Sequence, residues 1–492
     1  MRGREKGSTL AAHWPLLVVL ALAAVPRATI GAAYWPTLLQ SDSFTYVRMA
    51  HRGDPVAIDP GRPSGYALIV DLFSRIDGSL AAITVAQHLA GLATGVLVYA
   101  LLWRLGGSRW AATLTAAVVL ASAQLATLEQ YVLAETFFVL FVVASAFLVC
   151  ARGTGVGAVA ASGLLLASAA MLRTAGLFLT PAWLVYVLWR HRAVRPVAAG
   201  LVALALPLLA YSGIHAAQTG RFGMTQSDGW FLYGRVAPFA SCSTMRVPAG
   251  TEGLCEERPQ SQSAAFYVWD PDSPARSFGN MYDEDLERRH EDNRLLRAFA
   301  VEAIRAEPLS YARVVARDLL LFFLPAPAAG MPAQGRLPAP GSHEYGEPKE
   351  EELEYYTEIQ REHVPGYPDH SRADGVAKQA ALGLQRWLWT PAWVAAAALL
   401  AGLAAFVVAL RRRKEVGNVP ELALLVGGPL LLLVGTAATA EYEDRYLTSV
   451  LPVLISGGAL ALLGLYRAAP GQPARRGRRA RAWRSGRSGA PR

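Results

Sequence analysis

The sequence predicts an all-α polytopic integral membrane protein of about ten transmembrane helices, with a small extracytoplasmic cap of surface helices and loops. Three observations predict this fold class. Hydrophobic residues make up 53% of the 492 residues and charged residues only 17%, which is more apolar surface than one soluble core can bury. The apolar runs have the length of bilayer crossings, about 20 residues each. Polar, irregular sequence gathers in two long segments between them.

The apolar runs form a group of seven before the longer polar segment and a group of three after it. We expect the spans at 14–33, 80–103, 110–128, 131–151, 154–172, 174–190, 197–217, 387–410, 420–439 and 446–466. The basic N-terminus and the first run together are similar to a signal peptide. However, Val25-Pro26-Arg27 interrupts a small-residue cleavage site, so we expect a retained signal anchor.

The positions of lysine and arginine in short loops predict the orientation of the spans. The basic clusters are Arg2/Arg4/Lys6, Arg104/Arg109, Arg152, Arg190/Arg192/Arg195, Arg411 to Lys414 and the tail from Arg467. All of these clusters lie in the cytoplasm if the stretch Val314 to Pro325 does not cross the membrane. That stretch carries Arg317 and Asp318, which are costly at mid-membrane, so we expect it on the surface. The chain is therefore expected in the cell membrane, with both termini cytoplasmic and the polar segments outside.

This topology divides the chain into four regions. They are a transmembrane module at 1–217 with its first extracytoplasmic loop at 34–79, a cap at 218–386, C-terminal transmembrane helices at 387–466, and a basic tail at 467–492 that we expect to be disordered. The cap holds too many aromatic residues for a disordered linker, Trp230 and Trp269 among them. The net charge of +9 is mostly a topology signal plus the tail, which we expect to bind anionic membrane lipids rather than nucleic acid.

The chain has three cysteines. Cys242 and Cys255 lie in the cap, and a location outside the cell permits a disulfide between them. Two free thiols in a loop are the alternative. Cys150 lies at the end of a span and is expected to pack there. The sequence contains no His/Cys cluster with metal-ligand spacing and no glycine-rich nucleotide-binding loop, so no cofactor is expected.

Five short motifs follow one another at the outer ends of the spans. They are Asp42-Ser43-Phe44-Thr45-Tyr46, Arg62-Pro63-Ser64-Gly65-Tyr66, Glu135-Thr136-Phe137-Phe138, Arg173-Thr174-Ala175-Gly176, and Arg445-Tyr446 followed by Pro452. In this order and on this side of the membrane they resemble the GT-C superfamily of polyprenyl-phosphate-sugar-dependent glycosyltransferases. That group includes the protein O-mannosyltransferases and the lipid A aminoarabinose transferases. The resemblance covers about 30–220 and 385–465.

The resemblance implies a hexosyl- or pentosyltransferase that moves a sugar from a polyprenyl-phosphate donor to an extracytoplasmic acceptor, which is a protein, a glycan or a lipid. It also implies an inverting displacement at the anomeric carbon. Such a reaction needs a base for the acceptor hydroxyl, and a carboxylate in a partly dry cleft can serve. We expect Asp42 to be this base and Tyr46 of the same motif to contact substrate. The alternative for Asp42 is the N-cap of a helix that begins at Ser43.

Glu135 is the second acid of the resemblance, although relatives often have aspartate at this position. It is expected to orient the acceptor or to pair with a cation. The alternative is a water-exposed glutamate at the membrane interface. A divalent ion held jointly by Asp42 and Glu135 stays open, although no dedicated ligand cluster argues for it.

Arg173 is the first candidate for binding the carrier phosphate. It is a lone arginine between two apolar runs on the outer side, against the positive-inside preference, and its guanidinium suits a pair of phosphate oxygens. Arg62 and Arg445 are second candidates, and ion pairs with nearby carboxylates are the alternative role for both. His88 is a candidate for binding sugar or phosphate, against the alternative of a histidine satisfied on a helix face.

A transporter or lipid-carrier flippase of envelope polysaccharide assembly is the rival prediction from another functional class, and a noncatalytic assembly partner is a third. Transporters often show repeated halves with helices interrupted at mid-membrane. This chain shows no repeat, and its charged candidates cluster at the outer ends of the spans. That distribution favours chemistry at the membrane surface over translocation.

Overall fold

The computed structural model describes residues 12–53, 56, 58–150, 154–191, 193–324, 336–338, 350–368, 370, 375–412 and 418–468. Over these residues the chain is helical, and the only β contact among them is an isolated bridge between Leu38 and Tyr131. Several parts of the sequence predictions lie outside the described residues. They are the N-terminal basic cluster, Arg152, Arg192, Arg413 and Lys414, and the tail beyond residue 468.

Six segments of the described chain are long and apolar enough to cross a membrane. They are α2 (Trp14–Ala33), α5 (Ala81–Arg104), α11 (Val194–Thr219), the segment Val376–Arg411 with α19 (Ala392–Arg412), the segment Val419–Thr439, and α22 (Asp444–Ala468). The segment Val419–Thr439 consists of α20 (Val419–Leu422), a π-helical turn (Ala423–Gly427) and α21 (Gly428–Thr439). The predicted fold class, a helical polytopic membrane protein, is confirmed.

The remaining predicted spans coincide with shorter helices. These are α6 (Arg109–Leu120), α8 (Glu135–Cys150), α9 (Val156–Leu172) and α10 (Thr180–Arg190). The run predicted at 110–128 is interrupted after α6 and continues as α7 (Ala123–Leu128). The run predicted at 174–190 begins as a 3₁₀ segment (Thr174–Leu179), and Pro181 stands in the first turn of α10, where a missing backbone N–H costs least.

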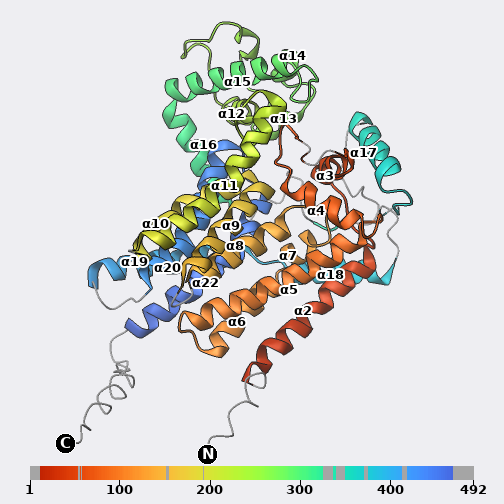
Figure 1. Ribbon diagram of the computed structural model, residues 1–492. Coiled ribbons are helices and arrows are strands. Elements are labelled where there is room, and N and C mark those ends of the chain that lie inside the picture. Colours follow the sequence, from red (N-terminus) through yellow and green to blue (C-terminus); the bar gives the residue numbers. More distant parts are fainter. Residues whose placement is uncertain are drawn as a thin grey trace, which may run out of the picture.

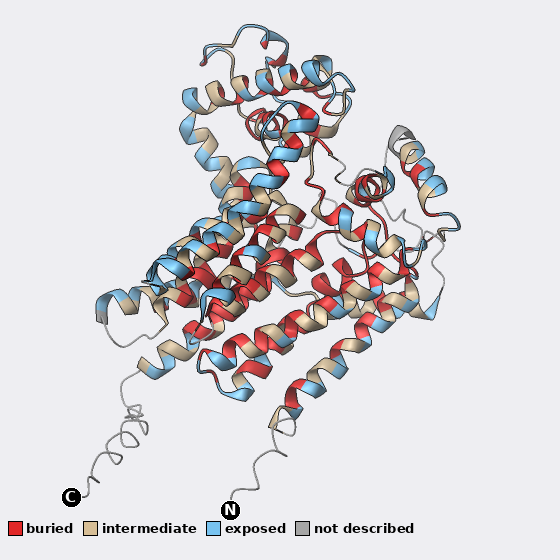
Figure 2. Ribbon diagram, in the orientation of Figure 1, coloured by how far each residue is buried: buried red, intermediate tan, exposed pale blue. Residues whose placement is uncertain are grey.

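The helices pack around α22, which is the most buried of the six long segments. Helix α8 packs on both α9 and α22, and Figure 2 shows buried residues concentrated in the middle of the bundle, with exposed positions along its outside. Large apolar side chains such as Leu114, Leu206 and Leu400 are exposed there. Exposed apolar surface on this scale suits hydrocarbon rather than water.

Five helices form a cap with its own hydrophobic core. They are α12 (Asp228–Val236), α13 (Ala264–Trp269), α14 (Pro274–Phe278), α15 (Leu286–Ala306) and α16 (Pro308–Leu321). Trp230, Tyr233, Tyr267 and Phe299 are buried in this core. Figure 1 shows the cap at the end of the bundle opposite the start of α2 and the end of α22. The stretch predicted to lie outside the membrane at 314–325 mostly belongs to α16.

Two helices from the predicted cap region lie elsewhere. Helix α17 (Glu350–His363) packs on α3 (Ser41–His51), where Tyr356 stacks on Phe44 with ring centroids 4.4 Å apart. Helix α18 (Val376–Leu388) packs on α2 and α7, and α4 (Gly65–Ser74) packs on α3. The segment 218–386 therefore comprises a compact cap and two further helices that cover the N-terminal module (Figure 1).

Buried polar contacts anchor the cap on the loop between α21 and α22. Arg235 donates to Asp318 over 2.7 Å inside the cap, and the same Asp318 oxygen accepts the backbone N–H of Tyr442 at 3.1 Å. Glu441 accepts the backbone N–H groups of Ala264 and Ala265 at the start of α13, at 2.9 and 3.1 Å. Burial raises the pKa of Glu441, and the nearby Glu443 adds to the effect. The loop that leads into α22 is thus held by the cap.

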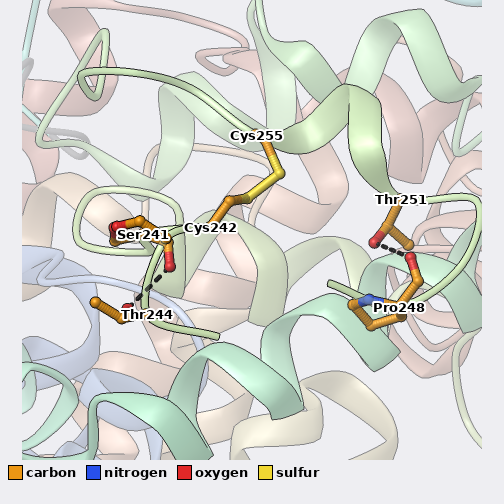
Figure 3. Close-up of a disulfide and its surroundings, with 7 residues drawn as sticks. Ser241, Cys242, Thr244, Pro248, Thr251 and Cys255 are labelled. Atoms are coloured by element: carbon orange, nitrogen blue, oxygen red, sulfur yellow. Dashed lines mark hydrogen bonds between the residues drawn. A yellow bond between two sulfur atoms is a disulfide. The ribbon is translucent and has the colours of Figure 1, made fainter. Parts of the chain in front are cut away.

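A disulfide between Cys242 and Cys255 closes a loop of the cap (Figure 3). The loop is also held by local hydrogen bonds, from the Thr244 hydroxyl to the Ser241 carbonyl at 2.9 Å and from the Thr251 hydroxyl to the Pro248 carbonyl at 2.7 Å. Of the two alternatives left open by the sequence, the structure contains the bridge. Cys150 is a buried free thiol in the bundle.

The disulfide is expected to stabilise the cap. Closing a loop of 13 residues restricts the unfolded chain and contributes about 3 kcal/mol. The double variant Cys242→Ser/Cys255→Ser should therefore unfold at a lower temperature than the parent, measured on purified protein in detergent. A reducing agent should lower the unfolding temperature of the parent but leave the double variant unchanged. An unchanged parent would contradict this prediction.

The Arg235–Asp318 pair provides a second test of cap stability. Both side chains are 2% exposed, so Asp318→Asn leaves a buried guanidinium without its counter-charge, at a cost of about 3–5 kcal/mol. Glu302→Gln is the matched control, since it breaks the more exposed pair with Arg305 and should cost no more than about 1 kcal/mol. Denaturant unfolding of the purified variants measures both values. Equal stability of the two variants would refute this role of Asp318.

Candidate active site

A cavity of about 430 Å³ lies between the cap and the ends of the bundle helices that face it. Its volume falls in the range of small-molecule sites. It is lined from α3, α8, the turn after α9, α21 and α22 on the bundle side, and from α12, α13 and α15 on the cap side. Its charged lining residues are Asp42, Arg62, Glu135, Arg173, Asp228, Arg297 and Arg445. The five charged residues singled out in the sequence therefore converge on one cavity.

A short backbone pairing brings the two predicted acids together. The Leu38 N–H donates to the Gln130 carbonyl at 2.9 Å, and the Val132 N–H donates to the Leu38 carbonyl at 3.1 Å. Helix α3 starts three residues after Leu38 and α8 starts three residues after Val132. The pairing therefore holds Asp42, in the first turn of α3, beside Glu135, the first residue of α8.

Asp42 is not the N-cap of its helix. Helix α3 begins at Ser41, and Gln40 occupies the cap position, where its backbone N–H donates to the Ser43 hydroxyl at 3.0 Å. The predicted alternative, a helix that begins at Ser43 and is capped by Asp42, is wrong because the helix starts two residues earlier. The carboxylate of Asp42 instead accepts hydrogen bonds from Arg62 and Arg445.

Arg62 is presented by a turn that a buried aspartate organises. Asp59 is 1% exposed, and one of its carboxylate oxygens accepts the backbone N–H groups of Gly61 and Arg62, at 2.9 and 3.1 Å. This is the common way in which aspartate stabilises a turn. The turn directs the Arg62 guanidinium to Asp42, with which it forms an ion pair.

Arg173 lies at the end of α9 and forms an ion pair with Glu135. Its guanidinium lies 5.2 Å from the ring centroid of Tyr446, a favourable cation–π arrangement. The start of α4 packs closely on the end of α9, since a side chain at Gly65 would collide with the Met171 carbonyl. Glu135 is 2% exposed, so the alternative of a water-exposed interfacial glutamate is wrong.

Arg445 joins the two acids. One of its terminal nitrogens donates to Asp42 at 2.9 Å and to Glu135 at 3.3 Å, and the other donates to Glu443 at 2.9 Å. Arg445 is 5% exposed. Of the neighbouring acids considered as structural partners, only Glu443 contacts it, because Glu441 is bonded to α13 and Asp444 to Tyr442.

Arginines and carboxylates of the site balance in number. Four arginines and three carboxylates line the cavity, and Glu443, which does not line it, pairs with Arg445. Burial alone raises the pKa of Asp42, but the charges of Arg62 and Arg445 outweigh it and hold that pKa well below its ordinary value. Asp42 is therefore ionised at neutral pH, and the arginines of the lining provide donors for an anionic ligand.

The other two predicted substrate contacts lie in different places. Tyr46 lines the cavity one turn after Asp42. His88 does not line it. One ring nitrogen of His88 lies 3.0 Å from Glu129 and the other 3.0 Å from Gln130, and Glu129 is paired with Arg27 of α2. This geometry corresponds to the alternative of a satisfied helix-face histidine.

The cavity also contains functional candidates that the sequence did not indicate. Asp228, Arg297, Ser227 and Trp269 line it from the cap. Charged and aromatic residues are common throughout the cap. Only the packing of the cap on the bundle shows which of the cap residues line the cavity. Among the described residues, no group of three or more histidines, cysteines or acids is placed to hold a metal ion. Asp42 and Glu135 are each bonded to arginine.

Residues 79–194 match the model of the dolichyl-phosphate-mannose-protein mannosyltransferase family. A search of curated protein sequences finds no match. Three solved structures show distant similarity. An oligosaccharyltransferase from Archaeoglobus fulgidus is 13% identical with a TM-score of 0.38, over 94% of this chain and 52% of that chain. ArnT from Cupriavidus metallidurans is 16% identical with a TM-score of 0.37, over 90% of this chain and 78% of that one.

The arabinosyltransferase EmbB from Mycobacterium smegmatis is 15% identical with a TM-score of 0.34, over 92% of this chain and 41% of that one. The chain thus spans about half the length of the archaeal oligosaccharyltransferase. At these TM-scores neither fold nor function is inferred from the three structures. The family match over residues 79–194, which include Glu135 and Arg173, confirms for that segment the resemblance to glycosyltransferases that use polyprenyl-phosphate sugars.

Proposed function

We propose that this protein is a membrane glycosyltransferase that moves a sugar from a polyprenyl-phosphate carrier to the hydroxyl of an extracytoplasmic acceptor. One observation carries the proposal. Asp42, Glu135, Arg62, Arg173 and Arg445 line a single cavity at the end of an apolar helical bundle. The family match over residues 79–194 supports it.

The phosphodiester of the donor carries one negative charge, which the arginines that line the cavity suit. Arginine binds phosphate oxygens through paired N–H donors. Arg173 and Arg445 are the proposed contacts, because both face the cavity beside Glu135. When the bond between the anomeric carbon and the phosphate oxygen breaks, the leaving polyprenyl phosphate gains a second negative charge. Cations already in place stabilise that charge most in the transition state.

Asp42 is the proposed general base. The acceptor hydroxyl attacks the anomeric carbon and its proton passes to the Asp42 carboxylate, while the electron pair of the broken bond stays on the carrier phosphate. In the structure Asp42 is bonded to Arg62 and Arg445. A phosphate that draws the Arg445 guanidinium toward itself weakens the hold of Arg445 on Asp42. Donor binding thereby makes Asp42 a better base.

Glu135 is the proposed positioning acid. It pairs with Arg173 and also accepts a hydrogen bond from Arg445. Its carboxylate therefore holds the two guanidinium groups close to each other. The polyprenyl chain would lie in the membrane among the apolar helices, and the acceptor would enter from the cap. In the proposed enzyme the cavity faces the outside of the cell and the two termini lie in the cytoplasm. The sugar is a hexose or a pentose.

Asp42→Asn is expected to lower the rate of transfer by about a hundredfold to ten-thousandfold, the usual contribution of a general base. The amide keeps the shape of the side chain but cannot take the proton. The rate is measured with purified protein, a panel of polyprenyl-phosphate sugars and labelled acceptors. The product to be counted is acceptor-bound sugar together with free polyprenyl phosphate.

The matched control is Asp71→Asn, which removes a carboxylate of α4 that pairs only with the exposed Arg75. This control should transfer at the parental rate, and both variants should reach parental amounts in the membrane. Full activity of Asp42→Asn would remove Asp42 as the base. Movement of the lipid-linked sugar across vesicles without any transfer would identify a flippase instead.

The pH dependence of kcat/KM tests the electrostatics of Asp42. A general base works above its pKa, and the arginines hold the pKa of Asp42 well below its ordinary value. The parent should therefore show no loss of kcat/KM from this group as the pH falls from neutrality to about 5. Burial raises the pKa of Asp42, and in Arg62→Gln one of the positive charges that oppose this effect is missing. The acid limb of the kcat/KM profile should therefore move upward by about 1–3 pH units.

Arg75→Gln provides the control for this profile, because Arg75 pairs with Asp71 on the surface. Its kcat/KM profile should coincide with that of the parent. A loss of kcat/KM in the parent between neutrality and about pH 5 that stays in place in Arg62→Gln would show that Asp42 is not the group that titrates. kcat/KM is the quantity to use, since it reports the ionisation of the free enzyme.

A further inference from the structure

The cap side of the cavity differs chemically from the bundle side. Thr225, Ser227, Asp228, Phe231 and Leu232 line it from the start of α12 and the segment before it. Trp269 lines it from the end of α13, and Arg297 from α15. This wall combines hydroxyls, one carboxylate, one guanidinium and two aromatic rings. The proposed phosphate contacts, Arg173 and Arg445, belong to the opposite wall.

The carboxylate of Asp228 is held in place from behind. The buried Asn293 donates its amide to one Asp228 oxygen at 2.8 Å, and its own amide oxygen accepts the Gly229 N–H at 2.8 Å. Asn293 is 3% exposed, and a side chain at Gly229 would collide with the Asn293 carbonyl. The other Asp228 oxygen lies 3.2 Å from Arg297. Asp228 is thus an acceptor positioned by Asn293 and paired with the Arg297 guanidinium, and both side chains of this pair are more than half exposed.

Ser227 provides an independent indication of a ligand. It lines the cavity and is 1% exposed. Its hydroxyl has no hydrogen-bond partner among the described residues. A buried hydroxyl without a partner is destabilising and is uncommon in native structures. A ligand hydroxyl in the cavity would supply the missing hydrogen bond.

Trp269 and Phe231 add an apolar surface to these polar groups. Their rings pack edge to face with centroids 5.9 Å apart, and both side chains are partly exposed. A sugar ring presents C–H groups on its faces and hydroxyls around its edge. Aromatic rings cover such a face, while a carboxylate, a guanidinium and a serine hydroxyl can each bond an edge hydroxyl.

We propose that the wall formed by Ser227, Asp228, Phe231, Trp269 and Arg297 is a saccharide-binding subsite for the acceptor. The inference rests on the proposed function, and it narrows the acceptor to a glycan. A peptide acceptor is less well matched. It brings a single reacting hydroxyl, and recognition of an extended peptide commonly uses an exposed strand edge, whereas the described residues form no strand.

Direct saccharide binding to the full-length protein in nanodiscs tests the subsite without any donor. The probes are trisaccharides of mannose, glucose and arabinose, followed by saturation-transfer NMR and titration. At least one probe should bind the parent. Trp269→Ala and Asp228→Asn should each weaken binding of that probe by about tenfold or more. A site that binds the hydroxyls of a sugar loses much of its affinity when one of its contacting side chains is removed.

Arg294→Ala is the matched control, since Arg294 is on the same helix as Arg297 but pairs with the exposed Glu291. It should bind the saccharide like the parent. The proposal is overturned if no probe binds, if Trp269→Ala and Asp228→Asn bind like the parent, or if a Ser/Thr peptide binds through these residues in place of a saccharide. Saccharide binding with no transfer from any donor would overturn the proposed enzymatic function but not the subsite.

Discussion

The ion pairs around Arg445 hold the candidate active site together. The guanidinium bonds Asp42, Glu135 and Glu443 at once, and so joins the start of α3, the start of α8 and the loop just before α22. Asp42 and Glu135 are within reach because the backbone pairing of Leu38 sets the starts of α3 and α8 side by side and because α22 packs on α8. A buried cation with several carboxylates is costly unless every partner is in place. The site therefore depends on the relative positions of these helices.

The cap contributes to that arrangement from the other side. Glu441 and Tyr442, which precede Arg445 by only a few residues, are bonded to α13 and to Asp318. The start of α12 and the end of α13 also line the cavity. One loop thus connects the buried Arg235–Asp318 pair of the cap to the cation that joins the two acids. A change in how the cap sits on the bundle would move Arg445, so cap and bundle form one functional unit.

Much of the fold was accessible from the sequence because the membrane constrains it so strongly. An apolar run of bilayer length must satisfy its backbone internally, and a helix does so locally. All ten predicted runs correspond to helices or helix pairs. The cap was harder to predict, since its helices are short and amphipathic. Nothing local to Glu350–His363 or Val376–Leu388 shows that these helices pack on α3 and α2 instead of on the cap core.

The sequence by itself determined the membrane-embedded helical class, the long polar segments between the apolar runs, and a set of five charged residues ordered along the chain. These follow from hydropathy and charge, which are properties of each segment alone. Only the tertiary structure decided that Asp42 and Glu135 share Arg445, across 403 and 310 residues of sequence, while His88 belongs to a different cluster. The cap residues Asp228 and Trp269 also became candidates only when the cap docked. Side-chain proximity across hundreds of residues depends on packing, and no local pattern records it.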